Sequence, residues 1–234
     1  MKKTLKIHIL TIVLAVSLAA AGTLLTGCDA KPSGEEHEFV EKNYTVPAED
    51  VNALTIDVKN RKIELLPSEN EQICITYYES DKEFYELNRT EKKELRMTYA
   101  ENKQWGDYVG RKTALENRTV RIELPQSALH SLTLNTTNAD ISLPPLSVLN
   151  SVTVSVNNGN IALENLNPGN AVTLNAKNGT ISGTIAGTMD EFAIHTQVKK
   201  GESNLPPEKE TGTKTLLASA NNGNIQLNFL GQNK

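Results

Sequence analysis

The stretch SVTVSVNNGNIAL, residues 151–163, contains two short runs of alternating apolar and polar residues around an Asn-Gly pair. Alternation with a period of two is typical of a β-strand that buries one face. Gly adopts positive φ angles without a steric penalty, and Asn tolerates them better than most residues. The stretch therefore predicts two strands that are joined by a corner at Asn158 and Gly159.

The same pattern recurs along the chain at a fixed spacing. The first apolar residue of each unit stands at Leu132, Val152, Val172 and Phe192, which are 20 residues apart, and again at Leu216. The Asn of the corner recurs at Asn138, Asn158, Asn178 and Asn222, whereas the Phe192 unit is interrupted by the longer stretch QVKKGESNL. The segment LTIDVKNRKIELL, residues 54–66, has the same offsets. The repeat therefore extends over much of the chain.

Two all-β architectures fit this repeat. A constant spacing of 20 residues favours a β-solenoid, a single-stranded β-helix of about 20-residue coils, because fixed periods of about 20 to 50 residues mark stacked repeats. In that arrangement Leu132, Val152, Val172 and Phe192 lie one above another, and Asn138, Asn158 and Asn178 can form a hydrogen-bonded ladder. Asn-Gly is also a strong hairpin signal, so an antiparallel β-sandwich or meander is the alternative. Residues 80–95 are interpreted as a loop or a long hairpin.

The amino terminus predicts the compartment. Three lysines precede an apolar run from Ile7 to Ala21, as in a secretory signal peptide. The run ends in LTGC, residues 25–28, and there the segment resembles the signal of bacterial lipoproteins. The resemblance implies that residues 1–27 are removed, that Cys28 carries a diacylglycerol and fatty acyl chains such as palmitate, and that the protein is lipid-anchored on the extracytoplasmic face of the cell membrane. An uncleaved transmembrane anchor over residues 7–25 is the alternative.

The region that follows Cys28 differs in composition from the repeats. Residues 28–44 are polar and acidic, which predicts a flexible tether, and residues 45–234 are expected to form the β-repeat domain. Removal of the signal takes three of the 24 basic side chains and none of the 28 acidic ones, so the net charge becomes −7. This charge argues against nucleic acid as a partner. Cys74 has no intrachain partner for a disulfide once Cys28 is lipidated, and we expect it to be an apolar strand residue.

Catalytic and metal-binding motifs are scarce. His37, His130 and His195 are far apart in the sequence, and their spacing does not match the zinc motif H-E-x-x-H. Asp140, Glu164 and Asp190 fall near predicted corners and are interpreted as solvated side chains rather than as a catalytic or calcium site. The sequence therefore predicts no catalytic, cofactor-binding or metal-binding residue, and its one predicted modification site is Cys28.

Aromatic residues are distributed unevenly. The chain has one Trp, six Tyr and four Phe, and most of them lie between residues 77 and 108. The preferred interpretation is a part of the core that is built from rings. The alternative is an exposed platform for sugar rings, because large apolar groups that remain exposed usually mark a binding surface.

A family resemblance joins these observations. The segments VTVSVNNGNIAL, VTLNAKNGTISG and LTIDVKNRKIELLP resemble the bacterial β-repeat family DUF4097, whose members are labelled "putative adhesin", over residues 51–229. The resemblance implies a secreted or membrane-attached β-solenoid without an established enzymatic activity. We therefore predict a non-enzymatic surface lipoprotein that presents its repeats to an envelope polysaccharide or protein. The alternatives are a glycan-binding module that uses residues 77–108 and a polysaccharide-acting β-helix enzyme.

Overall fold

A computed structural model describes residues 38–108, 113–126 and 129–231, which belong to one compact unit. These residues form seventeen strands in one hydrogen-bonded network and four short 3₁₀ helices. The helices are η1 (Ala48–Asp50), η2 (Trp105–Tyr108), η3 (Glu116–Arg118) and η4 (Met189–Glu191). The prediction of an all-β protein is therefore confirmed. None of the helices in the described residues has the length and hydropathy needed to cross a bilayer.

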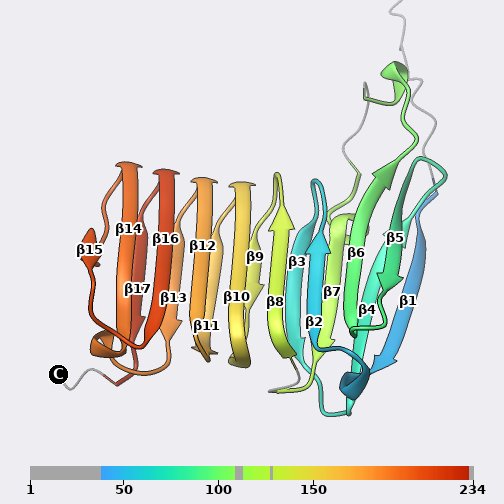
Figure 1. Cartoon of the computed structure of the whole chain (residues 1–234). Coiled ribbons are helices and arrows are strands. Elements are labelled where there is room, and N and C mark those ends of the chain that lie inside the picture. Colours follow the sequence, from blue (N-terminus) through green and yellow to red (C-terminus); the bar gives the residue numbers. More distant parts are fainter. Residues whose placement is uncertain (1–37, 109–112, 127–128, 232–234) are drawn as a thin grey trace, which may run out of the picture. The chain divides into compact units, whose positions relative to one another are not determined.

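Most strands belong to two series of parallel neighbours (Figure 1). The first series contains, in spatial order, β6 (Glu94–Glu101), β2 (Ala53–Asp57), β8 (Leu129–Thr136), β10 (Leu146–Asn158), β12 (Ala171–Asn178), β16 (Lys214–Asn222) and β14 (Phe192–Lys200). The second series contains β7 (Thr119–Leu124), β3 (Lys62–Pro67), β9 (Ile141–Leu143), β11 (Ile161–Pro168), β13 (Ile181–Ile185) and β17 (Ile225–Phe229).

The 20-residue spacing corresponds to the strand register. Val152 lies opposite Leu132 on one side and Val172 on the other. On the second series Ile161 lies between Ile141 and Ile181. The strands on either side of the Asn158-Gly159 corner, β10 and β11, do not form an antiparallel hairpin across it. They pair in parallel at a different place, where residues 146–148 lie opposite residues 166–168.

One apolar core contains the inward-facing side chains of both series. The first apolar position of the repeats is at most 1 % exposed at Leu54, Leu132, Val152, Val172 and Leu216. Burying one such side chain contributes about 1.5 to 3 kcal/mol relative to leaving it exposed. The alternation that predicted the strands therefore also places their apolar faces against each other.

The strand order departs from the sequence order at the carboxyl-terminal end. β16 lies between β12 and β14, so Leu216 is the neighbour of Val172, and Ile194 rather than Phe192 is the neighbour of Leu216. The prediction that Phe192 lies on Val172 is therefore wrong. The long segment between β14 and β16 allows the chain to pass beyond the stack and return. Part of this segment, β15 (Glu208–Lys209), pairs with β14 in antiparallel fashion and covers its outer edge.

A similar exchange occurs at the amino-terminal end. β2 lies between β6 and β8, and β3 lies between β7 and β9, so the first repeat is enclosed by strands that come later in the chain. Antiparallel strands complete this end, because β1 (Val40–Pro47) pairs with β4 (Gln72–Glu79), β4 pairs with β7, and β5 (Glu83–Arg89) pairs with β6. Residues 80–95 therefore contribute a strand and the turn of the β5–β6 hairpin.

The first strand corrects one predicted boundary. β1 begins at Val40, inside the stretch 28–44 that was predicted to be a tether. Its eight residues all pair with β4, and Val46 is buried, which gives this polar segment enough partners to be ordered. The residues between Cys28 and Val40 are thus all that remains of the proposed tether.

Candidate functional site

The predicted lipid-attachment residue, Cys28, and the predicted signal peptide lie outside the described residues. Cys74 lies in β4 as predicted and is half-buried. The hydroxyl of Thr45 in the neighbouring strand β1 donates a hydrogen bond to its Sγ at 3.6 Å. This sulfur therefore takes part in strand packing.

The corner asparagines form a ladder of side-chain amides. Asn158 Nδ2 donates to Asn138 Oδ1 at 2.6 Å, and Asn178 Nδ2 donates to Asn158 Oδ1 at 2.6 Å. Asn138 donates to Asn60 at one end, and Asn222 donates to Asn178 at the other. The predicted ladder is therefore confirmed, and it is longer than the three residues that the sequence indicated.

The glycines beside this ladder are required for close packing of successive corners. A Cβ at Gly159 would collide with the carbonyl oxygen of Ala139, and a Cβ at Gly179 would collide with that of Gly159. Gly179 has a φ of 154°, whereas Gly159 is not among the glycines with positive φ. The explanation of Gly159 by a positive φ is therefore wrong, and close backbone approach takes its place.

The outer side of the first series carries uncharged polar side chains along the middle of its central strands, and the charged Lys177 stands only near the end of β12. We call this the polar face, and its residues are Thr133, Thr153, Thr173, Asn135, Ser155 and Asn175. These side chains are half-buried by their neighbours. Hydrogen bonds also join side chains of neighbouring strands on this side. The hydroxyls of Ser131 in β8 and Ser151 in β10 are 3.1 Å apart, and Ser219 in β16 donates to Asn175 Oδ1 in β12 at 3.0 Å. The repeat thus displays rows of hydroxyl and amide groups in fixed register.

A buried charged cluster lies at the amino-terminal end of the core. Arg61 is 2 % exposed and forms an ion pair with Glu83, which also pairs with Lys103. Arg61 Nε donates to the hydroxyl of Tyr85 at 2.8 Å, and the guanidinium lies 5.3 Å from the centre of the Tyr99 ring. Burial by itself would raise the pKa of Glu83, but the hydrogen bond from Lys103 and the charge of Arg61 outweigh burial and hold that pKa below its ordinary value.

The position of Arg61 in the repeat explains why this cluster exists. Asn60 belongs to the ladder but does not form a regular corner, because the large residue Arg61 follows it. The small residues Ala139 and Gly159 follow Asn138 and Asn158 at the equivalent positions. At the regular corners, Gly159 and Gly179 each face the corner of the preceding repeat. Beyond Arg61 the neighbouring elements are β5 and β6 instead of another such corner, so a large side chain has room there. Arg61 thereby joins the repeats to the antiparallel strands.

The aromatic residues divide into two groups. Tyr77 and Tyr85 are buried, and their rings make an edge contact with centroids 5.1 Å apart, while Tyr85 makes a similar contact with Tyr99 at 5.9 Å. This group belongs to the core, as the preferred interpretation predicted. Trp105 and Tyr108 in η2 are 84 % and 61 % exposed. The exposed platform of the alternative interpretation is therefore restricted to η2.

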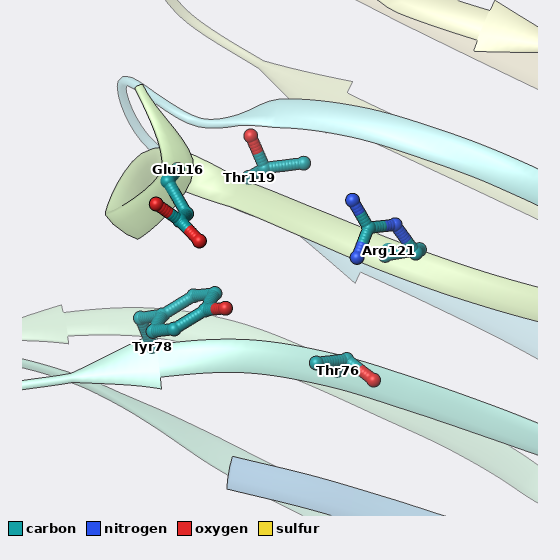
Figure 2. A pocket seen from close by; sticks show the side chains of 5 residues that line it. All are labelled: Thr76, Tyr78, Glu116, Thr119 and Arg121. Carbon is teal, nitrogen blue, oxygen red and sulfur yellow. The ribbon is translucent and has the colours of Figure 1, made fainter. Parts of the chain in front are cut away.

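Figure 2 shows a small polar pocket between β4, β7 and η3. It is lined by Thr76, Tyr78, Glu116, Thr119 and Arg121 and has a volume of about 60 Å³. Tyr78 donates to Glu41 at 2.7 Å, and Arg121 Nε lies 3.5 Å from Glu64 Oε2. Because these groups already have partners and the space is small, the pocket supports binding of water rather than of a substrate.

The remaining titratable candidates are dispersed. His130 lies in β8 and His195 in β14, which are separated by β10, β12 and β16. Asp140 accepts a hydrogen bond from the backbone N–H of Asn160 at 2.7 Å, as expected of a corner residue. Glu164 borders a shallow hollow of about 340 Å³ that also includes Pro67 and Pro144. Within the described residues, no group of three or more His, Cys, Asp or Glu could hold a metal ion.

Comparison with known proteins identifies related sequences and folds. A family model described as Toastrack DUF4097 matches residues 51–229. No curated protein matches the chain. A structure described as a putative cell adhesion protein from Clostridium sporogenes ATCC 15579 has a TM-score of 0.55 and 12 % identity, covering 82 % of this chain and 100 % of its own. A putative adhesin from Bacteroides fragilis NCTC 9343 has a TM-score of 0.36 and 10 % identity, covering 82 % of this chain and 97 % of its own.

Proposed function

This chain belongs to the Toastrack DUF4097 family, and on that premise we propose that it is a non-enzymatic, lipid-anchored β-solenoid protein on the extracytoplasmic face of a bacterial cell membrane. Its role is to present the polar face to a polymer or a protein of the cell envelope. The membrane is the first partner, through diacylglycerol on Cys28, and the envelope component is the second.

The in-register stacking of the repeats carries this proposal. Side chains at equivalent positions of β8, β10 and β12 lie directly beside each other, as Thr133, Thr153 and Thr173 do. Neighbouring strands are about 4.8 Å apart, so the groups form regular rows. A ligand with its own repeating hydroxyl or amide groups can form several hydrogen bonds to such rows at once, which raises affinity without a deep pocket.

Two further observations support the proposal. LTGC at residues 25–28 contains the thiol and the small preceding residues that lipoprotein processing requires. The Clostridium sporogenes structure of the same fold is described as a putative cell adhesion protein. An adhesin-like role at the surface fits both the anchor and the exposed rows of polar groups.

Binding to isolated envelopes tests the polar face. The lipidated protein is sedimented with washed envelopes before and after enzymatic digestion of the wall polymer, which separates a polymer from a protein partner. Thr153→Arg places a long charged side chain in the middle of the polar face and should reduce binding at least about tenfold. Gln226→Arg, in the exposed row of β17 on the other series, is the control and should bind normally. Equal binding by both variants would rule out the polar face.

Metabolic labelling with a fatty-acid analogue tests the anchor. Because Cys28 is the acceptor that LTGC provides, Cys28→Ala should lose the label and accumulate as an unprocessed precursor. Cys74→Ala is the matched control and should retain the label. Label that persists in Cys28→Ala would contradict lipidation at this residue.

A glycan-binding module is the second candidate, and the exposure of Trp105 is the observation that favours it. Exposed aromatic rings can stack on sugars, whereas Tyr77 and Tyr85 are buried and cannot do so. Saturable binding on a glycan array that is lost in Trp105→Ala would support this function. An array on which wild type and Trp105→Ala behave alike would argue against it.

A further inference from the structure

Large apolar side chains are exposed mainly at one end of the domain. In the described residues, seven such side chains are exposed, and four of them are Val40 (51 %), Trp105 (84 %), Tyr108 (61 %) and Leu115 (60 %). We call these four residues the apolar tip. They come from three separate segments of the chain, namely β1, η2 and the residue before η3. Isolated exposed apolar residues need no explanation, but a gathering of them marks a contact surface.

Strand pairing and side-chain contacts connect these segments at the amino-terminal end of the domain. Val40 lies opposite Glu79 at the end of β4, and the backbone N–H of Asn102 donates to Lys82 O at 2.9 Å just beyond that strand. Lys82 Nζ lies 3.5 Å from Asp107 Oδ2 in η2. Leu115 precedes Glu116, whose carboxyl group points toward Tyr78 from across the small pocket (Figure 2). In Figure 1, η2 lies beyond the end of β6, on the side where β1 begins.

The apolar tip also lies where the chain enters the domain. Val40 is both a member of the tip and the first residue of the first strand. Residues 28–39 connect it to the proposed lipid on Cys28. A chain of that length spans at most about 40 Å even when it is fully extended. The tip therefore remains within about that distance of the bilayer that holds the lipid.

The charges around the tip are already paired within the protein. Lys59 Nζ lies 2.6 Å from Glu101 Oε1, Lys82 pairs with Asp107, and Lys103 pairs with Glu83. Approach to a lipid headgroup therefore leaves none of these side chains without a counter-charge. The net charge of −7 that is left when residues 1–27 are removed does not favour anionic lipid, so the contact has to depend on the aromatic and apolar side chains.

We propose that the apolar tip rests in the headgroup region of the membrane to which Cys28 is anchored, with zwitterionic phospholipid as its ligand. Trp and Tyr prefer this region because one side of each ring is apolar and the other carries a hydrogen-bond donor. A patch of this size binds weakly alone, but the tether keeps it close to the surface and converts the contact into an intramolecular one. The proposal rests on the lipid anchor of the proposed function. It fixes the end of the domain that faces the membrane and leaves the polar face accessible.

Trp105 is the only tryptophan of the chain, so its fluorescence reports on the tip directly. The lipidated protein is reconstituted into phosphatidylcholine vesicles with and without brominated acyl chains near the headgroup. We expect roughly twofold quenching of Trp105 emission by the brominated lipid, and protection from iodide in the water, because interfacial aromatic side chains sit at headgroup level. Emission that iodide quenches fully and brominated lipid leaves unchanged would overturn the proposal.

A pair of variants keeps Trp105 as the reporter. Leu115→Asp places a charge in the tip and should abolish most of the quenching by brominated lipid. Leu230→Asp is the matched control, because Leu230 is also 60 % exposed but follows β17 at the other end of the chain. Quenching that survives in Leu115→Asp as in Leu230→Asp would show that the tip does not contact lipid.

Flotation separates this proposal from the proposed anchor. Protein that fails to float with the vesicles has no lipid on Cys28, and this result contradicts the anchor alone. The tip is then tested with a hexahistidine tag in place of Cys28 on vesicles that contain a nickel-chelating lipid, where the same quenching is expected. Protein that floats without quenching contradicts the tip contact alone, and Trp105 emission that responds instead to soluble wall glycans would identify a sugar surface in its place.

Discussion

The central repeats and the amino-terminal end of this domain are stabilised in different ways. In the repeats, each residue packs beside its equivalent from the neighbouring repeat, as Asn158 does between Asn138 and Asn178. At the amino-terminal end, unlike residues meet, and Arg61, Glu83 and Tyr85 form a buried cluster. Stability is therefore distributed over many small equivalent contacts in one region and concentrated in a few side chains in the other.

Deletion of residues 214–234 should have the largest effect. A terminal unit of an ordinary repeat protein contacts a single neighbouring unit and can be lost at moderate cost. Here the deletion removes β16 and β17, and β16 lies between β12 and β14. We expect loss of the cooperative thermal transition measured by circular dichroism. A chain that ends at Gly231 is the control, and a deletion variant that still melts cooperatively would show that β14 can pair with β12 instead.

Arg61→Ala should have the next largest effect. The change leaves Glu83 buried with Lys103 as its remaining charged partner among the residues that the structure describes. Removal of one member of a buried pair typically costs about 3 to 5 kcal/mol. Denaturant unfolding measures this cost. Arg121→Ala is the control, because Arg121 is half-exposed and its pair with Glu64 should contribute about 1 kcal/mol or less. Equal losses would mean that the cluster does not join the two regions.

Gly179→Val tests the packing of the corners in the repeats. A Cβ at this position collides with the carbonyl oxygen of Gly159, and the φ of 154° disfavours a branched side chain. We expect a loss of about 2 to 3 kcal/mol in unfolding free energy. Ala139→Gly is the comparison, because this corner already accommodates a Cβ and should change little. An unaffected Gly179→Val protein would show that the corners can move apart.

Acid should weaken the amino-terminal region through Glu83. Its pKa in the folded protein is below the ordinary value of 4.5, so the stabilisation is present at and above that pH. It is lost as the pH falls through the lower folded-state pKa. Glu83→Gln lacks this contribution, so its unfolding free energy should fall less steeply below pH 4.5 than that of the wild type. Parallel pH profiles for the two proteins would contradict the assignment.

Asn158→Ala should have the smallest effect. It removes one rung of the ladder, where the hydrogen bonds are exposed and water can replace them. We expect a loss of about 0.5 to 1.5 kcal/mol. Thermal unfolding of Asn157→Ala, which changes the exposed neighbour outside the ladder, provides the control. A loss at Asn158 as large as that at Arg61 would erase the distinction between distributed and concentrated stability.

The repeats could be predicted from the sequence because one spacing determines their contacts. The positions of Leu132, Val152 and Val172 follow from the 20-residue period, and so does the ladder at Asn138, Asn158 and Asn178. The exchange of β16 and β14 could not be predicted. Phe192 and Leu216 are both apolar residues at the first position of their repeats, so the pattern does not indicate which of the two repeats lies next to Val172. The cluster around Arg61 joins residues more than 20 positions apart without a shared pattern.

The apolar tip shows a similar limit. Composition indicated that aromatic residues gather between 77 and 108, but the sequence does not distinguish the buried Tyr85 from the exposed Trp105. Both stand in segments with polar neighbours. Only the pairing of β5 with β6 and the position of η2 beyond β6 separate them.

The place of β16 and β17 also determines when the fold can be completed. Synthesis proceeds from the amino terminus, so β14 is made before β16, the strand with which it pairs in parallel. At the other end β2 and β3 are made first, yet they pair with β8 and β9 on one side. A nascent chain that stops before residue 214 therefore has open edges at β12 and β13, which can pair with other chains. The time between synthesis and closure, rather than the finished structure, is when this protein is most exposed to aggregation and proteolysis.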